Sequence, residues 1–337
     1  MYLASAYGGM ADPVTSAKLS VLGLAYPVAL GATVLLMVVW LCMRLWQLAL
    51  IPLLAIIASW GPLTTFSPLN FTGRDVAEAD STRTFRVLTY NVMNFTDNTG
   101  VRHTPNRTIQ YILDCDADIV CLQEVNLPGE YDVARFFEKR FPGYHVGYFM
   151  FVTDKGSYGN VTLSKFPILN KGKLMFDKSS NLAIFTDLKI GEGAEIRVYN
   201  CHFESYNVSL SRLKKSVADK DGELMWETEE KMKKSIRRRP EQVDKVMSDI
   251  EDCTLEAIVT GDFNDNPMSY TYNRLKKGRD DSFVEVGKGF GATYSFLWPF
   301  IRIDYILYPS HFTAVSHSVP RVRYSDHYPV IAEINLK

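Results

Sequence analysis

Cysteine and histidine are scarce in this chain of 337 residues, which has five of the first and six of the second. No two cysteines form a C-x-x-C pair, and so few of them exclude a disulfide scaffold. We interpret the cysteines as buried thiols and leave a single bridge open. A surplus of either charge is also absent, because 37 basic and 38 acidic side chains give a net charge of −1. No global field therefore attracts nucleic acid or an acidic membrane surface.

Apolar side chains, by contrast, are abundant. Hydrophobic residues make up 47% of the chain and charged residues 22%, which excludes a disordered, collagen-like or coiled-coil chain and predicts a large buried core. At roughly 150 residues per domain, the length fits one large domain or two ordinary ones.

Charge is almost missing from the first 73 residues, which contain only Asp12, Lys18 and Arg44. The uncharged stretch Leu19–Met43 is long enough to cross the ~30 Å hydrocarbon layer as a helix. A second apolar stretch follows Arg44 and is also long enough, although Pro52 weakens it. A cleaved signal peptide fits less well, because its apolar region spans only about 7–15 residues. A buried hairpin in a soluble core is the remaining alternative.

We therefore predict a transmembrane helical hairpin and a membrane location. The predicted parts are an N-terminal tail (1–17), two transmembrane helices (18–63), a linker (64–84) and a folded domain (85–337). The positive charges give little asymmetry from which to deduce the topology. If the link at Arg44 lies in the cytoplasm, the folded domain is extracytoplasmic, and this is the orientation that we predict.

The region after the linker alternates short apolar runs with helical patterns. Runs rich in β-branched and aromatic residues predict strands over residues 85–92, 119–125, 145–152, 160–165, 182–190, 195–203, 257–263, 301–308 and 328–336. Helical spacing predicts helices over 104–114, 131–140 and 268–277. Because several strands carry apolar residues in succession, both of their faces are predicted to be covered. The expected fold class is α/β (α+β), a four-layer sandwich of two packed mixed β-sheets flanked by helices.

The segment Ser209–Asp252 is long, heavily charged and compatible with a helix. Six of the nine residues from Lys231 to Arg239 are basic. A solvated helical face is the plain explanation, because runs of charge usually are one. A substrate-facing arm is the functional alternative, since phosphate-rich ligands are bound by such patches.

Short polar side chains stand at the ends of otherwise apolar predicted strands. The residues concerned are Asn91, Glu124, Asp262, Asn264, Asp304, Asp326 and His327. Taken singly, Asn91 could cap a turn, Glu124 could be a salt-bridge partner and Asn264 could begin a turn. Taken together they predict a site, because a carboxylate in a β core costs several kcal/mol unless it is paired or bound to a metal. Oxygen ligands suit Mg²⁺ or Mn²⁺ better than zinc, for which the sequence has no thiolate and imidazole cluster.

The motifs that contain these residues resemble the endonuclease/exonuclease/phosphatase superfamily. They are TYNVMNF, DIVCLQEV, GNVTLSKFPI, NCHFES, GDFNDNP, RIDYIL and SDHYPV, in this order, and they cover about residues 85–337. The superfamily includes apurinic endonucleases, deoxyribonuclease I, neutral sphingomyelinases, inositol polyphosphate 5-phosphatases and deadenylases. The apolar hairpin also resembles the membrane segments that precede such domains in some bacterial members.

The resemblance implies roles for the acidic residues. Glu124 would be the main Mg²⁺ ligand, with Asn91 and Asp326 near the ion. Asp262 would orient or deprotonate the attacking water. Asp304 would orient the imidazole of a neighbouring histidine and so favour its charged form.

The resemblance also implies donors for the phosphate. Asn264 would hold the phosphate, and His202 stands where relatives place a histidine or tyrosine that donates to a phosphate oxygen. A satisfied core histidine is the alternative for His202. His327 would be the partner of Asp304, and whether Asp262 or this pair is the base stays open.

The predicted function is a membrane-anchored, Mg²⁺-dependent phosphoric ester hydrolase that cleaves a phosphodiester by in-line attack of water. A cation and preorganised donors favour this reaction, because the transition state spreads negative charge over the phosphoryl oxygens. An inositol-polyphosphate-type phosphomonoesterase and a catalytically silent binding domain are the alternatives. The substrate class is left open between nucleic acid, phospholipid headgroup and inositol phosphate. The lipid bilayer is an expected partner, and no obligate protein partner is inferred.

Overall fold

The computed structural model describes residues 1–70, 83–96, 105–129, 132–154, 156–191, 193–206, 222–296 and 298–336. These residues form two compact units, each assembled from separate stretches of the chain. The first unit contains Met1–Leu63, Phe203–Lys245 and Asn264–Arg274, and the second contains Thr64–His202, Val246–Phe263 and Leu275–Lys337.

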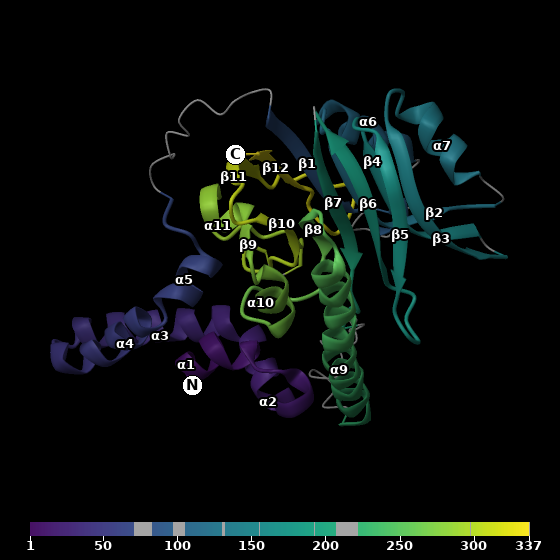
Figure 1. Ribbon diagram of the computed structural model, residues 1–337. Coiled ribbons are helices and arrows are strands. Elements are labelled where there is room, and N and C mark those ends of the chain that lie inside the picture. Colours follow the sequence, from purple (N-terminus) through teal and green to yellow (C-terminus); the bar gives the residue numbers. More distant parts are fainter. Residues whose placement is uncertain are drawn as a thin grey trace. The chain divides into compact units, whose positions relative to one another are not determined.

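The second unit is built on two six-stranded mixed sheets (Figure 1). The strand order is β11-β12-β1-β2-β4-β3 in the first sheet and β5-β6-β7-β8-β10-β9 in the second. The strands are β1 (Thr84–Asn91), β2 (Ile119–Leu127), β3 (His145–Thr153), β4 (Gly156–Ser164), β5 (Ile168–Met175), β6 (Leu182–Ile190), β7 (Ala194–His202), β8 (Glu256–Asp262), β9 (Arg279–Asp281), β10 (Asp304–Pro309), β11 (Thr313–Ser318) and β12 (Val330–Asn335). The pairs β1/β2 and β7/β8 are parallel, and the other neighbouring pairs are antiparallel.

Apolar side chains from both sheets form the core between them. Val87 and Ile119 of the first sheet pack with Val198 and Ile306 of the second. On the outer face of the first sheet lie α6 (Pro105–Asp114) and α7 (Val133–Arg140), which contribute residues such as Phe137 to a second apolar cluster. The predicted fold class, two packed mixed sheets flanked by helices, is therefore confirmed for this unit.

The strand predictions were incomplete at the sheet edges. β5, β9 and β11 were not predicted. β5 has four exposed and no buried residues among its eight, so it does not show the apolar pattern of a buried strand. β10 begins at Asp304, three residues later than predicted. The short helices η3 (Met93–Phe95) and α11 (Ser282–Val286) complete the described elements of this unit.

The cysteine interpretation was correct for only two residues. Cys121 and Cys201 are buried, but Cys42 is exposed and Cys115 and Cys253 are half-buried. All five are free thiols, so no bridge is formed.

The first unit begins with the apolar N-terminal segment, which is helical throughout most of its length. Its helices are α1 (Tyr2–Tyr7), η1 (Gly8–Met10), α2 (Pro13–Leu24), α3 (Tyr26–Cys42), α4 (Trp46–Ala58) and the start of α5 (Trp60–Phe66). Within the described residues, no single helix is long and apolar enough to cross a membrane. Two bent pairs have the necessary length and composition: Lys18–Leu24 with Tyr26–Cys42, bent by 66°, and Trp46–Ala58 with Trp60–Phe66, bent by 70°. The transmembrane hairpin stays a prediction.

The predicted linker does not begin at a helix end. α5 continues to Phe66, and residues 71–82 of the linker lie outside the described residues. The N-terminal helices also pack within the first unit against the segment that leads into α10 (Tyr270–Lys276). Asn266 Nδ2 donates to the Gly23 carbonyl at 2.8 Å, and a Cβ at Gly9 would collide with the Met268 carbonyl.

The charged segment contains α9 (Gly222–Asp252), whose residues up to Lys245 belong to the first unit. Residues 209–221 of the predicted segment lie outside the described residues. Most of the basic side chains between Lys231 and Arg238 are exposed or half-buried, but Arg239 is only 1% exposed. The basic run is therefore not a uniformly solvated face.

Candidate active site

The site is assembled where strand ends of the two sheets come together. Asn91 is the last residue of β1, His202 the last of β7 and Asp262 the last of β8. Asp304 begins β10 and is paired in the antiparallel register with Asp262, which in turn is level with His202 in the parallel β7/β8 pair. Strand register thus brings residues far apart in the sequence to one edge of the sandwich.

Glu124 reaches the site through an irregularity in β2. The register of the β2/β4 pair shifts between Leu122 and Val125, and Glu124 has a left-handed backbone with φ of 52°. Such a bulge redirects a side chain that would otherwise follow the alternation of the strand. The distortion therefore turns the Glu124 carboxylate toward the acids of the second sheet.

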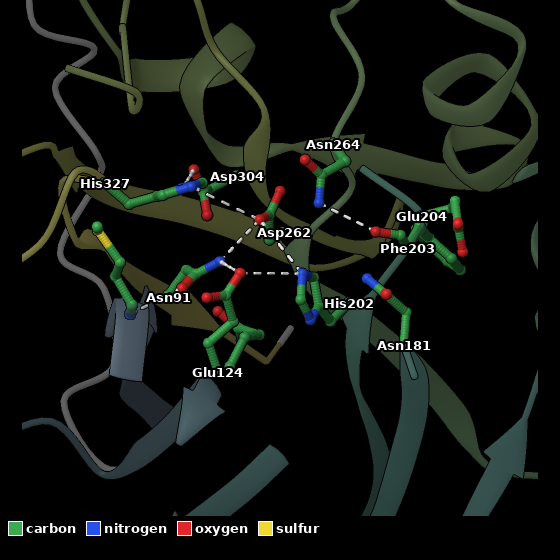
Figure 2. A network of polar contacts seen from close by, with 12 residues as sticks. Asn91, Glu124, Asn181, His202, Phe203, Glu204, Asp262, Asn264, Asp304 and His327 are labelled. Atoms are coloured by element: carbon green, nitrogen blue, oxygen red, sulfur yellow. Dashed lines mark hydrogen bonds and ion pairs between the residues drawn. The ribbon is translucent and has the colours of Figure 1, made fainter. Parts of the chain in front are cut away.

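The Asn91 amide joins the two central carboxylates (Figure 2). Its Nδ2 donates to Glu124 Oε1 at 3.1 Å and to Asp262 Oδ2 at 2.9 Å. The His202 and His327 imidazoles lie on either side of Asp262, with their Nε2 atoms 3.8 and 3.7 Å from Asp262 Oδ2. His202 Nε2 is also 3.5 Å from Glu124 Oε1. Acids from both sheets, an imidazole from β7 and an imidazole from the segment before β12 therefore share one site.

Asp304 and His327 form the acid–imidazole pair that the sequence predicted. His327 Nδ1 and Asp304 Oδ2 are 2.9 Å apart, and both residues are buried. Burial opposes a charge on the ring, but the carboxylates of Asp304 and Asp262 raise the pKa of His327 well above its ordinary value. Nδ1 is occupied by this contact, so Nε2 is the nitrogen that faces the site.

Burial also changes the acids. It raises the pKa of Glu124, against the hydrogen bond from Asn91. Burial together with the nearby Asp304 carboxylate raises the pKa of Asp262 to about 6, although His327 and His202 act in the opposite direction. Removing these carboxylates from water is costly for their charged forms, and a cation placed between them would relieve that cost.

The donor set fits a hard divalent cation. Two carboxylate oxygens, from Glu124 and Asp262, lie within hydrogen-bond distance of the same amide nitrogen of Asn91. Asp262, Asp304 and His327 also offer ligand atoms that all lie within 4.8 Å of one another. His327 Nδ1 already contacts Asp304, and on the Glu124 side of the site oxygen ligands predominate.

Asp326 and Asn264 are placed differently from the other predicted residues. Asp326 is half-buried next to His327. Burial raises the pKa of the Tyr294 phenol to about 12, and the Asp326 carboxylate, which accepts a hydrogen bond from the Tyr294 hydroxyl, acts in the same direction. Asn264 belongs to the first unit, where its Nδ2 donates to the Phe203 carbonyl at 3.0 Å. The seven predicted site residues other than Asn264, which include Asp326, belong to the second unit.

Sequence reasoning missed several polar side chains around the site. The Tyr294 ring lies 4.9 Å from the His327 ring, and the acids Glu124 and Asp262 help to raise the pKa of Tyr158, for which burial is the main cause. Beneath the site, Gln123 Nε2 of the first sheet donates to Asn200 Oδ1 of the second at 2.7 Å. A sequence signal for Gln123 and Asn200 exists, because both are amides inside otherwise apolar strands.

The model of the endonuclease/exonuclease/phosphatase family matches residues 88–327, and the chain belongs to this family. It is accordingly a phosphoric ester hydrolase. A second model, described only as a domain of unknown function, matches residues 1–66. A search of curated proteins finds no match.

Solved structures share the fold at low sequence identity. An endonuclease/exonuclease/phosphatase from Beutenbergia cavernae is 19% identical, with 75% of this chain and 72% of that chain covered and a TM-score of 0.57. The human Nocturnin catalytic domain, solved with a bound sulfate anion, is 19% identical over 77% of this chain and 96% of that chain, with a TM-score of 0.56. A mannosyl-6-phosphatase from Bacteroides thetaiotaomicron is 18% identical over 75% and 100%, with a TM-score of 0.50.

Proposed function

We propose that the chain is a membrane-anchored phosphodiesterase that uses Mg²⁺, or Mn²⁺ in its place. The observation that supports this best is the junction at Asn91, whose amide nitrogen lies between the Glu124 and Asp262 carboxylates. Two acids held this close favour a bound cation, and the flanking imidazoles of His202 and His327 supply donors for phosphoryl oxygens.

Glu124 would hold the ion, with Asn91 and Asp326 beside it. When bound, a divalent ion supplies positive charge toward a phosphoryl oxygen and toward the attacking water. Asp262 would orient that water and accept its proton, because its Oδ2 faces the centre of the site. The family match and the complete set of acids and imidazoles argue against a catalytically silent domain.

The histidines would act on the phosphate. His327 Nε2 and His202 Nε2 face the site from opposite sides of Asp262, so both can donate to oxygens of a phosphoryl group between them. Asp304 would hold the His327 ring and stabilise its charge. Asn264 belongs to the first unit, and its role as a phosphate donor stays a prediction. The charge that develops in an in-line displacement would thus meet preorganised groups.

Membrane anchoring is supported by the side chains of the N-terminal helices. Leu35, Leu41, Ile51 and Leu54 are between 52 and 64% exposed, on helices with almost no charged residue. A monomeric soluble protein rarely exposes so much apolar surface. We further propose that the family domain lies on the extracytoplasmic side, as the link at Arg44 would require if it is cytoplasmic.

The catalytic proposal is tested with the full chain in detergent and bis-p-nitrophenyl phosphate as substrate. Chelator should abolish hydrolysis, and added Mg²⁺ or Mn²⁺ should restore it. Asp262→Asn should lower turnover by roughly a hundredfold or more without lowering the thermal unfolding midpoint. Undiminished turnover in the presence of chelator would refute the proposal.

The anchoring proposal needs a separate test. Membranes from cells that express the full chain are washed with alkaline carbonate, which releases peripheral proteins. The full chain should remain in the membrane pellet, and its family domain should be cleaved by protease added to right-side-out vesicles. Release into the wash contradicts anchoring, and cleavage only in inside-out vesicles contradicts the proposed side.

A further inference from the structure

Four exposed apolar side chains of the second unit lie on the loop before β10 and on the segment that is hydrogen-bonded to this loop. Leu69, Phe290, Trp298 and Phe300 are 37 to 45% exposed. The Phe290 ring packs between Phe66 and Phe300, with ring centroids 5.5 and 5.3 Å away. We call Leu69, Phe290, Trp298 and Phe300 the aromatic rim. Grouped exposed aromatics of this kind mark an interaction surface rather than scattered surface residues.

The three rings of the aromatic rim, Phe290, Trp298 and Phe300, belong to the loop that supports the active site. Thr293 Oγ1 accepts hydrogen bonds from the backbone of Asp304 at 3.1 Å. Tyr294 forms a backbone bridge with His327, and Ser295 N donates to the Asp326 carbonyl at 2.8 Å. Because β10 begins at Asp304 directly after this loop, the aromatic rim lies at the end of the sandwich that bears the acids.

The chain that follows the apolar hairpin is fixed to the same loop. Arg302 Nη2 donates to the Thr65 carbonyl at 2.8 Å, Ser67 Oγ to the Gly289 carbonyl at 3.0 Å, and Asn70 Nδ2 to the Gly287 carbonyl at 2.9 Å. Arg302 itself is buried and paired with Asp281 at 2.6 Å. Residues 65–70, which include Leu69, are therefore held against this loop by the buried Arg302 side chain and by the side chains of Ser67 and Asn70.

Cationic side chains accompany the aromatic rim. The Arg321 guanidinium lies 4.0 Å from the centroid of the Trp298 ring, and Arg321 and Arg323 are exposed on the segment that leads to Asp326. Tryptophan is enriched at the headgroup level of membranes, and arginine is attracted to anionic lipids. A lipid surface binds apolar rings that have cations beside them. Here such rings also contact residues 65–70, which follow the apolar N-terminal helices in the sequence.

We propose that the aromatic rim contacts a lipid surface and presents the active site to lipid headgroups, so that the substrate is a phosphate ester of a membrane lipid. This inference rests on the proposed function, because it assigns a substrate class to the same site. The rim inserts its rings among the headgroups, while Arg321 and Arg323 bind their phosphates. Hydrolysis then takes place on lipid that reaches the site from the bilayer.

The test compares one enzyme on two substrates. The full chain is reconstituted in vesicles of phosphatidylcholine, phosphatidylglycerol and sphingomyelin, and release of water-soluble phosphorylated headgroup is measured. Turnover of soluble bis-p-nitrophenyl phosphate is measured in the same vesicles. In Trp298→Ser and Phe300→Ser, the ratio of lipid turnover to soluble turnover should fall roughly tenfold, since each loses an inserted ring. Trp226→Ser is the matched control, because Trp226 is 63% exposed on α9 and should leave the ratio unchanged.

Each result bears on the inference. A ratio that stays unchanged in both rim variants overturns it, and so does an equal loss of both activities, which would mean that the loop only shapes the site. A single-stranded oligonucleotide is assayed as a third substrate. If the two rim variants lose activity on this substrate alone, the rings stack on bases, and the inference is also overturned. If the unaltered chain cleaves the soluble diester but no lipid, the inference fails while the proposed function stands. If it cleaves neither, the proposed function itself fails.

Discussion

The contact between Asp304 and His327 joins two buried side chains through a hydrogen bond at Nδ1. In Asp304→Asn, the ring loses the negative partner that fixes its orientation and its charge. We expect turnover of bis-p-nitrophenyl phosphate to fall roughly a hundredfold or more. Asp177→Asn, at an exposed position, is the matched control. Full turnover in Asp304→Asn would remove the pair from the mechanism.

Glu124 gives a prediction about the metal. Replacing its carboxylate by an amide in Glu124→Gln removes one of the two acids that Asn91 brings together. We expect the Mg²⁺ concentration for half-maximal activity to rise at least about tenfold, with a smaller effect at saturating Mg²⁺. The measurement is a Mg²⁺ titration of activity. An unchanged Mg²⁺ requirement would place the ion elsewhere, for example at the Asp262, Asp304 and His327 group.

His317 links stability to pH outside the active site. Its Nδ1 lies 2.9 Å from Ser282 Oγ, and burial lowers the pKa of His317 from 6.5 to about 4, with Arg302 adding to this effect and Asp281 opposing it. Between these two values the unfolded chain binds the proton and the folded chain does not. The free energy of unfolding should therefore fall by about 1–3 kcal/mol as the pH drops from 6.5 to 4.

The measurement for His317 is urea unfolding at several pH values. His317→Gln keeps a polar side chain at the position but cannot titrate, so its stability should depend less steeply on pH over the same interval. Equal pH dependence in the two proteins would mean that His317 is protonated in the folded state.

At the residue scale, sequence showed which side chains meet but not how they are supported. Asp262 ends β8 and Asp304 begins β10, and strand ends of a sandwich converge, so the order of apolar runs already indicated their grouping. Glu124 lies inside β2 and joins them through a bulge that no local pattern shows. Tyr294 could not be found this way, because it reaches His327 through an isolated bridge in an irregular loop. Loop geometry depends on contacts that no local pattern encodes.

At the level of elements, α9 binds the segments that follow β7 and β8 through the buried side chain of Arg239. Arg239 Nε donates to the Glu204 carbonyl at 2.9 Å, and its Nη1 pairs with Asp265 Oδ2 at 2.6 Å. The guanidinium also lies 4.3 Å from the centroid of the Tyr206 ring. Glu204 follows His202 by two residues, and Asp265 follows Asn264 by one, so a single buried side chain holds two segments that carry predicted phosphate donors.

Arg239→Met should be strongly destabilising, because it leaves the Asp265 charge buried without its partner. Removing one member of a buried ion pair costs about 3–5 kcal/mol, which urea unfolding of the full chain can measure. Arg237→Met, on an exposed position of the same helix, should change stability little. If Arg239→Met is as stable as Arg237→Met, α9 does not fasten these segments.

Elements with a buried face were predictable and edge elements were not. β6 agrees with its predicted bounds, because it is buried on both faces, with seven of its nine residues buried, and so begins with a continuous apolar run. β5 has Asn170, Lys171 and Lys173 on an edge, where polar residues protect an unpaired strand and hide its pattern. The basic run in α9 predicted a solvated helical face, but Arg239 in this run is buried. Local sequence does not show which residue of a charged helix is turned inward.

For the whole molecule, the two compact units do not follow the predicted boundary at residue 84. The first unit joins the N-terminal helices to Phe203–Lys245 and Asn264–Arg274, which come from the family region. The contact is close, since a Cβ at Gly23 would lie 2.9 Å from Gly9 Cα and 3.1 Å from the Met268 carbonyl oxygen. The N-terminal helices are therefore expected to stabilise the segment that carries Asn264, in addition to any role as an anchor.

Gly23→Val tests this coupling, with Gly31→Val as the matched control. Both glycines lie in apolar helices, but an added Cβ at Gly31 has no atom within 4 Å among the described residues. Overpacking at Gly23 should cost about 1–3 kcal/mol of unfolding free energy and lower diesterase turnover, because the displaced helices would release Asn266 and the neighbouring Asn264. Gly31→Val should change neither property. If Gly23→Val loses stability but keeps full turnover, the N-terminal helices support the fold without positioning the site. If Gly23→Val keeps both its stability and its turnover, the N-terminal helices do not stabilise the segment that carries Asn264.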